Sequence, residues 1–210
     1  EDFLEQYYID LRPQEKFSYL VHLLKEEESE KVIIFCSARN TVELISHNLK
    51  KNGFKNAMLH GKLSQNRRLT VLHEFNNGNT DILIASAVAA RGLDIKFVTH
   101  VINYDLSGDP QEYVHRVGRT ARAGEKGKAI TLLCDRDYQT FNQILDRYHN
   151  LQVEALPKGQ FPKLRFETRV ERHHHFNKQR FRGRHFGRGN SHSREHSGHR
   201  RGSDNRQRSF

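Results

Sequence analysis

Val32-Ile33-Ile34-Phe35-Cys36, followed by Ser37-Ala38-Arg39, sets the pattern for the fold. Five consecutive apolar residues are typical of a strand that is covered on both faces, as strands of parallel sheets are. The polar residues after the run predict a loop at the carboxyl end of that strand. A helical stripe comes next, in which Val42, Ile45 and Leu49 recur at three- and four-residue steps. This part of the chain is therefore predicted to form a strand, a loop and a helix, in that order.

The same order recurs along the chain. Further strands are predicted at residues 6–10, 57–59, 82–85, 98–103 and 129–134. Further helical stripes, which we assign to core packing, are Phe17/Leu20/Val21/Leu24 within residues 14–25, Leu69/Leu72/Phe75, and Phe141/Ile144/Leu145/Tyr148. Strands that alternate with helices predict an α/β fold, a parallel sheet with helices on both faces. Ligands of such sheets bind beyond the carboxyl ends of the strands, where the loops gather.

The octet His115-Arg116-Val117-Gly118-Arg119-Thr120-Ala121-Arg122 carries the strongest chemical signal. Arg119 and Arg122 lie three residues apart, directly after a glycine. An arginine stays charged at working pH, and its planar fork matches phosphate oxygens. Two such groups held rigidly can stabilise charge on a transferring phosphate. A basic surface turn is the alternative for the octet taken alone.

A second motif, Ala89-Ala90-Arg91-Gly92-Leu93-Asp94, precedes the octet. Together the two stretches resemble the DEAD-box family of ATP-dependent RNA helicases, over roughly residues 1–150. The strand-plus-loop at residues 32–39 and the run from His60-Gly61 through Ser64-Gln65 to Arg68 are similar to two further motifs of that family. The resemblance implies a RecA-like fold, the second domain of a two-domain helicase, over residues 1–157.

The resemblance also implies roles around the nucleotide. Arg119 and Arg122 are expected to be arginine fingers that reach the γ-phosphate of ATP held on another domain. His115 is expected to relay hydrogen bonds between the nucleotide and RNA sides, with general base as the alternative. Gly92 is expected to give close backbone approach or a positive φ. Asp94 is expected to accept a hydrogen bond from the ribose, with an N-cap or turn role as the alternative.

Two arginines of these motifs have other expected roles. Arg91 is expected to pair with a carboxylate across the interdomain cleft. For Arg116, a ligand contact and a salt bridge both remain open.

The RNA backbone is expected to contact Arg39, Gly61 and Ser86, which follow three separate strands. Contacts to phosphate carry no base information, so binding is predicted to be sequence-tolerant. Gln65 and Arg68 are expected to organise the motif loops, and an exposed helix face is their alternative. The chain departs from the family at Ser86-Ala87, where relatives usually have Thr-Asp. The hydroxyl is kept and a carboxylate is lost.

The sequence lacks half of an ATPase site. It has no Gly-Lys-Thr/Ser phosphate loop and no Asp-Glu-x-Asp. ATP and Mg²⁺ are therefore expected to be held mainly by an amino-terminal RecA-like domain of the same protein. The chain also begins with Glu, so we expect it to be a piece of a longer protein.

Composition separates a tail from the domain. The net charge of +10 favours a polyanionic partner, and the basic residues concentrate toward the end of the chain. Residues 158–210 are rich in Arg, Gly and His and are predicted to be a flexible RNA-binding tail. There Arg182, Arg184 and Arg188 attract phosphates, and interleaved Phe residues stack on bases. The alternative is a linker or a solubility segment.

Other features are plainer. His173-His174-His175 is assigned to the tail, and no metal site is predicted. Cys36 and Cys134 are expected to be buried free thiols. No long apolar run or signal segment is present, so a soluble cytoplasmic protein is expected. Two rival functions stay open. One is a non-enzymatic RNA-binding module, and the other is a helicase domain that acts on DNA.

Overall fold

The computed structural model describes residues 4–27, 30–93, 95, 98–121 and 125–169. The strands are β1 (Leu4–Asp10), β2 (Val32–Cys36), β3 (Ala57–Leu59), β4 (Ile82–Ser86), β5 (His100–Asn103), β6 (Gly127–Leu133) and β7 (Glu154–Ala155). The helices are α1 (Lys16–Glu26), α2 (Arg39–Lys51), α3 (Gln65–Asn76), α4 (Ala87–Ala90), α5 (Pro110–Val117) and α6 (Tyr138–Arg147), and the 3₁₀ turn η1 (Asp135–Asp137) precedes α6. The predicted α/β fold is confirmed.

The strands form one sheet in the order β3-β4-β2-β5-β6-β1-β7, and every pair is parallel. Parallel pairing brings all carboxyl ends to one edge of the sheet. The register puts Cys36 opposite Ser86 and Leu59 opposite Ala85. The loops after β2, β3 and β4 therefore start side by side, although long stretches of sequence separate them.

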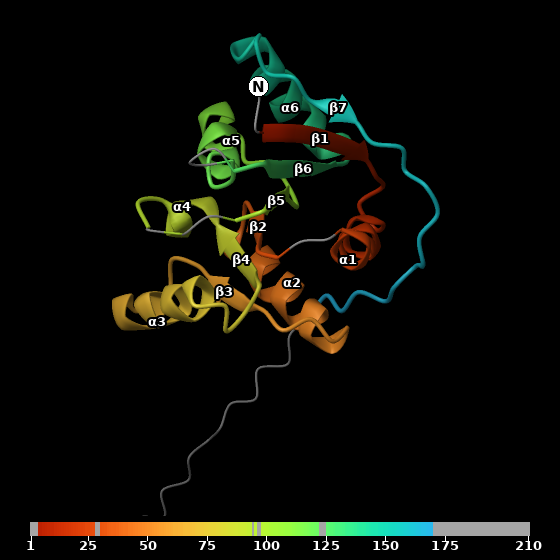
Figure 1. Ribbon diagram of the computed structural model, residues 1–210. Coiled ribbons are helices and arrows are strands. Elements are labelled where there is room, and N and C mark those ends of the chain that lie inside the picture. Colours follow the sequence, from red (N-terminus) through yellow and green to blue (C-terminus); the bar gives the residue numbers. More distant parts are fainter. Residues whose placement is uncertain (1–3, 28–29, 94, 96–97, 122–124, 170–210) are drawn as a thin grey trace, which may run out of the picture. The chain divides into compact units, whose positions relative to one another are not determined.

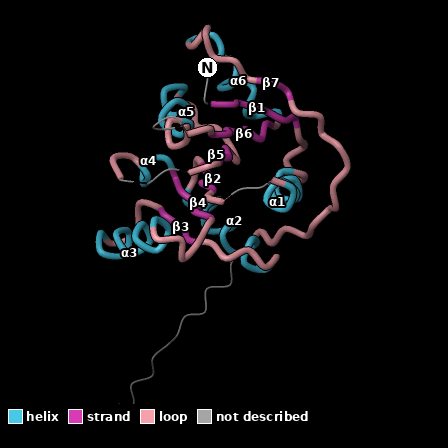
Figure 2. Tube along the Cα trace, in the orientation of Figure 1, coloured by secondary structure: helices cyan, strands magenta, loops and turns pink. Residues whose placement is uncertain are grey.

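Each face of the sheet buries its own apolar core. Helices α1 and α2 cover one face, where Leu20, Ile45 and Ile34 are fully buried. Helices α3 to α6 cover the other, which buries Phe75, Val117 and Ile33. Figures 1 and 2 show α1 on one side of the strands and α3, α4 and α5 on the other. Neighbouring strand residues such as Ile33 and Ile34 point to opposite cores, which explains why the strands are apolar throughout.

Three details differ from the prediction. Strand β7 has only two residues, both exposed, and no apolar run marks it. Leu69 was assigned to the core and is 54% exposed, so its stripe rests on Leu72 and Phe75 together with Val71. Helix α5 carries the first part of the octet, begins with Asp109 as its N-cap and has Pro110 in its first turn.

Residues 156–169, which we call the C-terminal strap, pack along the face that carries α1 and α2 (Figure 1). Phe161 lies against Tyr19 and Phe166 against Phe17, with ring centroids 5.2 Å and 5.1 Å apart. Leu164 donates its backbone N–H to Ser18 Oγ over 2.9 Å. Residues 158–169 had been assigned to the flexible tail, yet they lie on the domain. Three apolar side chains without a regular period give no sequence signal for such packing.

Polar contacts hold both ends of the strap. Lys158 pairs with Glu15 at 2.5 Å, and Glu167 pairs with Lys51 at 2.6 Å and His47 at 2.9 Å. The Lys51 ammonium, followed by His47, lowers the pKa of Glu167 to about 2. Asn48 also exchanges two hydrogen bonds with the backbone of residue 167.

Cys36 and Cys134 are buried free thiols, as predicted. Within the described ranges, no helix is long and apolar enough to cross a membrane.

Candidate functional site

Arg39, Gly61 and Ser86, the three residues assigned to the RNA backbone, lie at one edge of the sheet. Arg39 begins α2 just after β2, Gly61 follows β3, and Ser86 ends β4. Because the sheet order places β3, β4 and β2 next to each other, their carboxyl ends form one continuous surface. Gly61 is exposed, and the other two are half-buried. All three are thus accessible from the same side.

Arg68 on α3 is held beside this surface. Its Nη2 donates to the backbone carbonyl of Ala89 over 2.8 Å, and its Nη1 lies 3.4 Å from Gln65 Oε1. The contact joins α3 to the motif that follows β4. It is the geometry expected of residues that organise the loops, a role that stays a prediction for both side chains.

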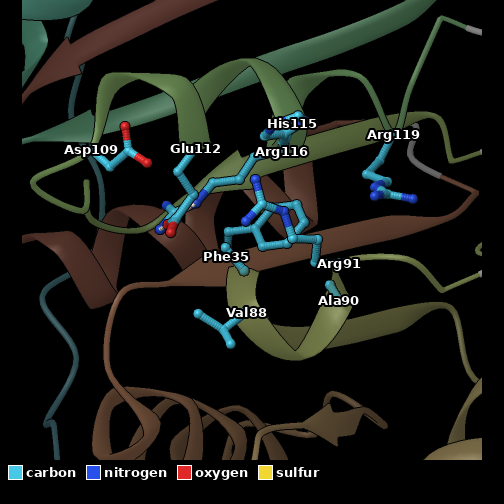
Figure 3. Close-up of a pocket in the computed structure, with 10 residues that line it drawn as sticks. Phe35, Val88, Ala90, Arg91, Asp109, Glu112, His115, Arg116 and Arg119 are labelled. Atoms are coloured by element: carbon cyan, nitrogen blue, oxygen red, sulfur yellow. Dashed lines mark hydrogen bonds and ion pairs between the residues drawn. The ribbon is translucent and has the colours of Figure 1, made fainter.

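A hollow opens between α4, Arg91 and α5. Figure 3 shows Arg91 near its centre, Asp109 and Glu112 on one side and Arg119 on the other. The residues that line it are Phe35, Ala87, Val88, Ala90, Arg91, Asp109, Glu112, His115, Arg116 and Arg119. The motif around Arg91 and the octet therefore meet in space, as the resemblance implies.

Arg119 is half-buried at this hollow. Its Nη1 donates to the Leu93 carbonyl over 3.2 Å, which places the guanidinium beside the turn at Gly92. Gly92 has a φ of +71°, and a Cβ there would meet no atom within 4 Å. Glycine is therefore favoured at position 92 by the positive φ of the turn, and not by close contact with other atoms of the chain.

Arg116, whose role was left open, is a buried ion-pair partner. It is 1% exposed, its Nη2 lies 2.5 Å from Glu112 Oε1, and its Nη1 donates to the Asp105 carbonyl over 2.7 Å. The guanidinium also stacks over Phe35, with its Cζ 5.5 Å from the ring centroid. With these partners it fixes α5 to the sheet, so His115 on α5 and Arg119 in the turn after α5 both extend from a fixed support.

A buried polar network lies behind the strand ends. Lys16 on α1 pairs with Asp137 at 2.5 Å and donates to the Tyr104 carbonyl over 3.0 Å. Asp105 accepts the backbone N–H of Ser37 at Oδ1, 2.5 Å away. Burial raises the pKa of Asp105, while the Ser37 N–H and the Arg116 charge oppose the rise. Through Asp105, which contacts both Ser37 and Arg116, the network connects the loop after β2 to α5.

Sequence reasoning missed several residues of this region. Asp105 and Lys16 belong to no motif, and only their partners across the fold reveal them. Val88 is an apolar residue that is 78% exposed at the rim of the hollow. Nothing in the sequence marks Val88 apart from its place before Ala89-Ala90-Arg91.

Several predicted site residues lie outside the described ranges. These are Asp94, Arg122, Arg182, Arg184 and Arg188. Ala121, which precedes Arg122, is described and has a φ of +54°. This left-handed conformation is unfavourable for alanine.

The arrangement suits an anionic ligand. Of the three arginines that line the hollow, Arg116 is paired with Glu112, and Asp109 caps α5 by accepting the N–H of Gln111. Arg91 and Arg119 also line the hollow, and guanidinium groups fit a polyphosphate. Among the described residues, no group of three or more His, Cys, Asp or Glu side chains gathers to hold a metal.

Comparisons with known proteins agree with this geometry. The family model "Helicase conserved C-terminal domain" matches residues 15–124. The helicase CshA of Streptococcus pneumoniae serotype 4 is 43% identical over 155 residues, 74% of this chain and 29% of the relative. RhlB of Photorhabdus laumondii is 43% identical over 168 residues, 76% of this chain and 39% of the relative. The chain thus spans well under half the length of these curated relatives.

Solved structures give the same answer. The Escherichia coli DEAD-box protein SrmB bound to RraA superposes with a TM-score of 0.69 at 36% identity, over 76% of this chain and 97% of that one. Saccharomyces cerevisiae Dbp5 bound to RNA and ADP BeF3 superposes with a TM-score of 0.70 at 33% identity, over 75% and 42%. The chain belongs to the helicase C-terminal domain family and is a RecA-like domain of the DEAD-box group.

Proposed function

We propose that this chain is the C-terminal half of an ATP-dependent RNA helicase, and that it completes an ATP site held mainly by another domain. The observation that carries the proposal is the meeting of Arg91 and Arg119 at one hollow, on the edge where the motif loops gather. The relatives named above are RNA helicases, which supports RNA as the substrate. The sequence contains no phosphate loop, so the chain alone is inactive as an ATPase.

Bound ATP, with Mg²⁺ held by the other domain, supplies the phosphoanhydride bond whose cleavage drives the cycle. This chain contributes charge and position. Arg119, together with Arg122, faces the γ-phosphate when the two domains close, and exclusion of water strengthens that interaction. His115, exposed on α5, relays hydrogen bonds between the nucleotide and RNA sides. Gly92 and Asp94 approach the nucleotide from the motif after β4.

RNA binds across the neighbouring strand ends. Arg39 and the hydroxyl of Ser86 contact phosphates, and the backbone at Gly61 lets a strand approach. Arg91, Gln65 and Arg68 keep the motif loops in place. Arg182, Arg184 and Arg188 add sequence-independent affinity from the tail. Domain closure around one strand bends it and parts a short duplex locally.

The remaining partners follow from this division of labour. An N-terminal RecA-like domain of the same protein carries the phosphate loop and the metal ligands. The whole protein acts in the cytoplasm. A non-enzymatic RNA-binding module and a DNA-acting helicase are the two rivals, and the relatives named above, which are ATP-dependent RNA helicases, speak against both.

The test is the ATPase and duplex-unwinding activity of the full-length protein with single-stranded RNA or DNA of the same sequence. We expect RNA to stimulate ATP hydrolysis strongly and DNA to stimulate it weakly. Equal stimulation by both would favour the DNA-acting rival. RNA binding without any hydrolysis would favour the non-enzymatic module.

A further inference from the structure

The carboxylate of Glu43 lies between Arg39, at the start of α2, and His60, which follows β3. Glu43 stands one turn after Arg39 on α2, and its Oε1 accepts from Arg39 Nε over 2.7 Å. The same oxygen is 2.7 Å from Arg39 Nη2 and 3.7 Å from His60 Nε2. One carboxylate oxygen thus lies near three nitrogens, two of Arg39 and one of His60.

An acidic side chain at a surface meant for RNA is unexpected, because it repels phosphate. Two effects therefore compete. The charge of Glu43 lowers the local positive potential, so its removal should strengthen RNA binding. The hydrogen bonds of Glu43 hold the long Arg39 side chain in one place. Without Glu43, Arg39 would lose more conformational entropy when RNA binds, so RNA binding should weaken.

The contacts of Glu43 favour the second effect. Glu43 takes the edge of the guanidinium formed by Nε and Nη2, which leaves Nη1 for a phosphate. His60 also lies close to the carboxylate, although its Nε2 is 3.7 Å from Glu43 Oε1 and forms no hydrogen bond to it. His60 is 5% exposed, and burial, despite the opposing charge of Glu43, lowers the pKa of its imidazole. The buried ring occupies the space next to Glu43 and so limits where the carboxylate can turn away from Arg39.

We propose that Glu43 is a positioning residue that orients Arg39 toward the RNA backbone. The proposal rests on the RNA contact proposed above for Arg39. It separates Glu43, which acts through another side chain, from the residues that touch RNA.

The experiment measures the affinity of the full-length protein for a fluorescent single-stranded oligouridine, with a non-hydrolysable ATP analogue present. Glu43→Ala should weaken binding about three- to tenfold although it removes a negative charge. Glu43→Gln keeps an oxygen that can accept from Arg39, so it should stay within about twofold of the unchanged protein. Asp81→Ala, which removes a negative charge at the opposite edge of the sheet, is the matched charge control and should have no such effect.

A double-mutant cycle separates positioning from a general structural role. If Glu43 acts through Arg39, Arg39→Ala combined with Glu43→Ala binds no more weakly than Arg39→Ala alone. Tighter binding by Glu43→Ala, or a Glu43→Ala loss that persists on the Arg39→Ala background, overturns the proposal and leaves the RNA contact of Arg39 standing. If Arg39→Ala alone has no effect, the proposed RNA contact itself is wrong, and the role of Glu43 falls with it.

Discussion

The strand-end edge and the C-terminal strap both carry arginine or lysine beside aromatic and apolar groups, yet they use them differently. At the edge, Arg91 and Arg119 line an open hollow, next to an exposed Val88. Along the strap, Lys158 and Glu167 close ion pairs, and the aromatic rings pack against α1. Side chains that line an open hollow are expected to contribute little to stability, whereas rings and ion pairs packed against the domain are expected to hold the fold together. Changes at the edge should therefore affect turnover, and changes along the strap should affect stability.

The largest difference is expected for catalysis. In the full-length protein, Arg119→Ala should lower RNA-stimulated ATPase by about a thousandfold or more, because one arginine finger contributes that much to the rate. Arg122→Ala should act alike. The exposed Arg165→Ala on the strap is the matched control and should leave turnover unchanged. Steady-state hydrolysis rates decide, and comparable losses at Arg119 and Arg165 would erase the distinction between the two regions.

Ion pairs of equal length should differ in strength with burial, because one lies in the interior and the other is partly exposed on the strap. Lys16–Asp137, behind the strand ends, and Lys158–Glu15, on the strap, both measure 2.5 Å. Lys16→Met leaves a buried carboxylate unpaired and should lower the free energy of unfolding by about 3–5 kcal/mol. Lys158→Met removes a side chain that is 41% exposed, and Glu15 keeps Arg12 as a partner, so the loss should stay under about 1 kcal/mol. Urea denaturation measures both, and equal losses would contradict the role of burial.

The strap should stabilise the domain without entering its chemistry. Phe161→Ala and Phe166→Ala each remove a half-buried ring, and each should cost about 1–3 kcal/mol of unfolding free energy, less than a fully buried ring. Thermal or urea unfolding checks the loss, with Arg165→Ala as the exposed control between them. ATPase of the full-length variants at a temperature where they stay folded should be unchanged. A folded variant with lost turnover would make the strap part of the site.

The smallest effect is expected at the octet. Ala121 has a φ of +54°, a conformation that is higher in energy for alanine than for glycine. Ala121→Gly should therefore stabilise the domain by about 0.5–1 kcal/mol, part of the gain being lost to the greater freedom of glycine in the unfolded chain. Urea denaturation measures this change. A destabilised glycine variant would show that residue 121 does not hold a left-handed conformation in solution.

The two regions also differ in how far the sequence predicts them. Continuous apolar runs such as residues 32–36 predict the sheet because both faces are buried, and motif order predicts which loops meet. The prediction that Leu69 is buried was wrong, because a helical stripe of apolar residues does not show where the sheet that covers it ends. The strap escaped prediction because Phe161, Leu164 and Phe166 follow no period and belong to no motif. Glu43 and Asp105 escaped because their importance lies in partners that only folding brings near.

The role of Arg116 could not be predicted from the sequence either. Its neighbours in the octet, Gly118 and Arg119, suggest a ligand contact as readily as a salt bridge. Only the positions of Glu112 and the Asp105 carbonyl separate the two, and they place Arg116 in the interior.

The most direct test asks whether Arg119 contacts a nucleotide that is bound to another domain. The measurement is the affinity of the full-length protein for single-stranded RNA, with and without a non-hydrolysable ATP analogue. The analogue should tighten RNA binding of the unchanged protein about tenfold or more, a typical coupling between two sites. Arg119→Ala should abolish that tightening and leave nucleotide-free RNA affinity unaltered. If the analogue increased the RNA affinity of the Arg119→Ala protein as strongly as that of the unchanged protein, the account would be contradicted.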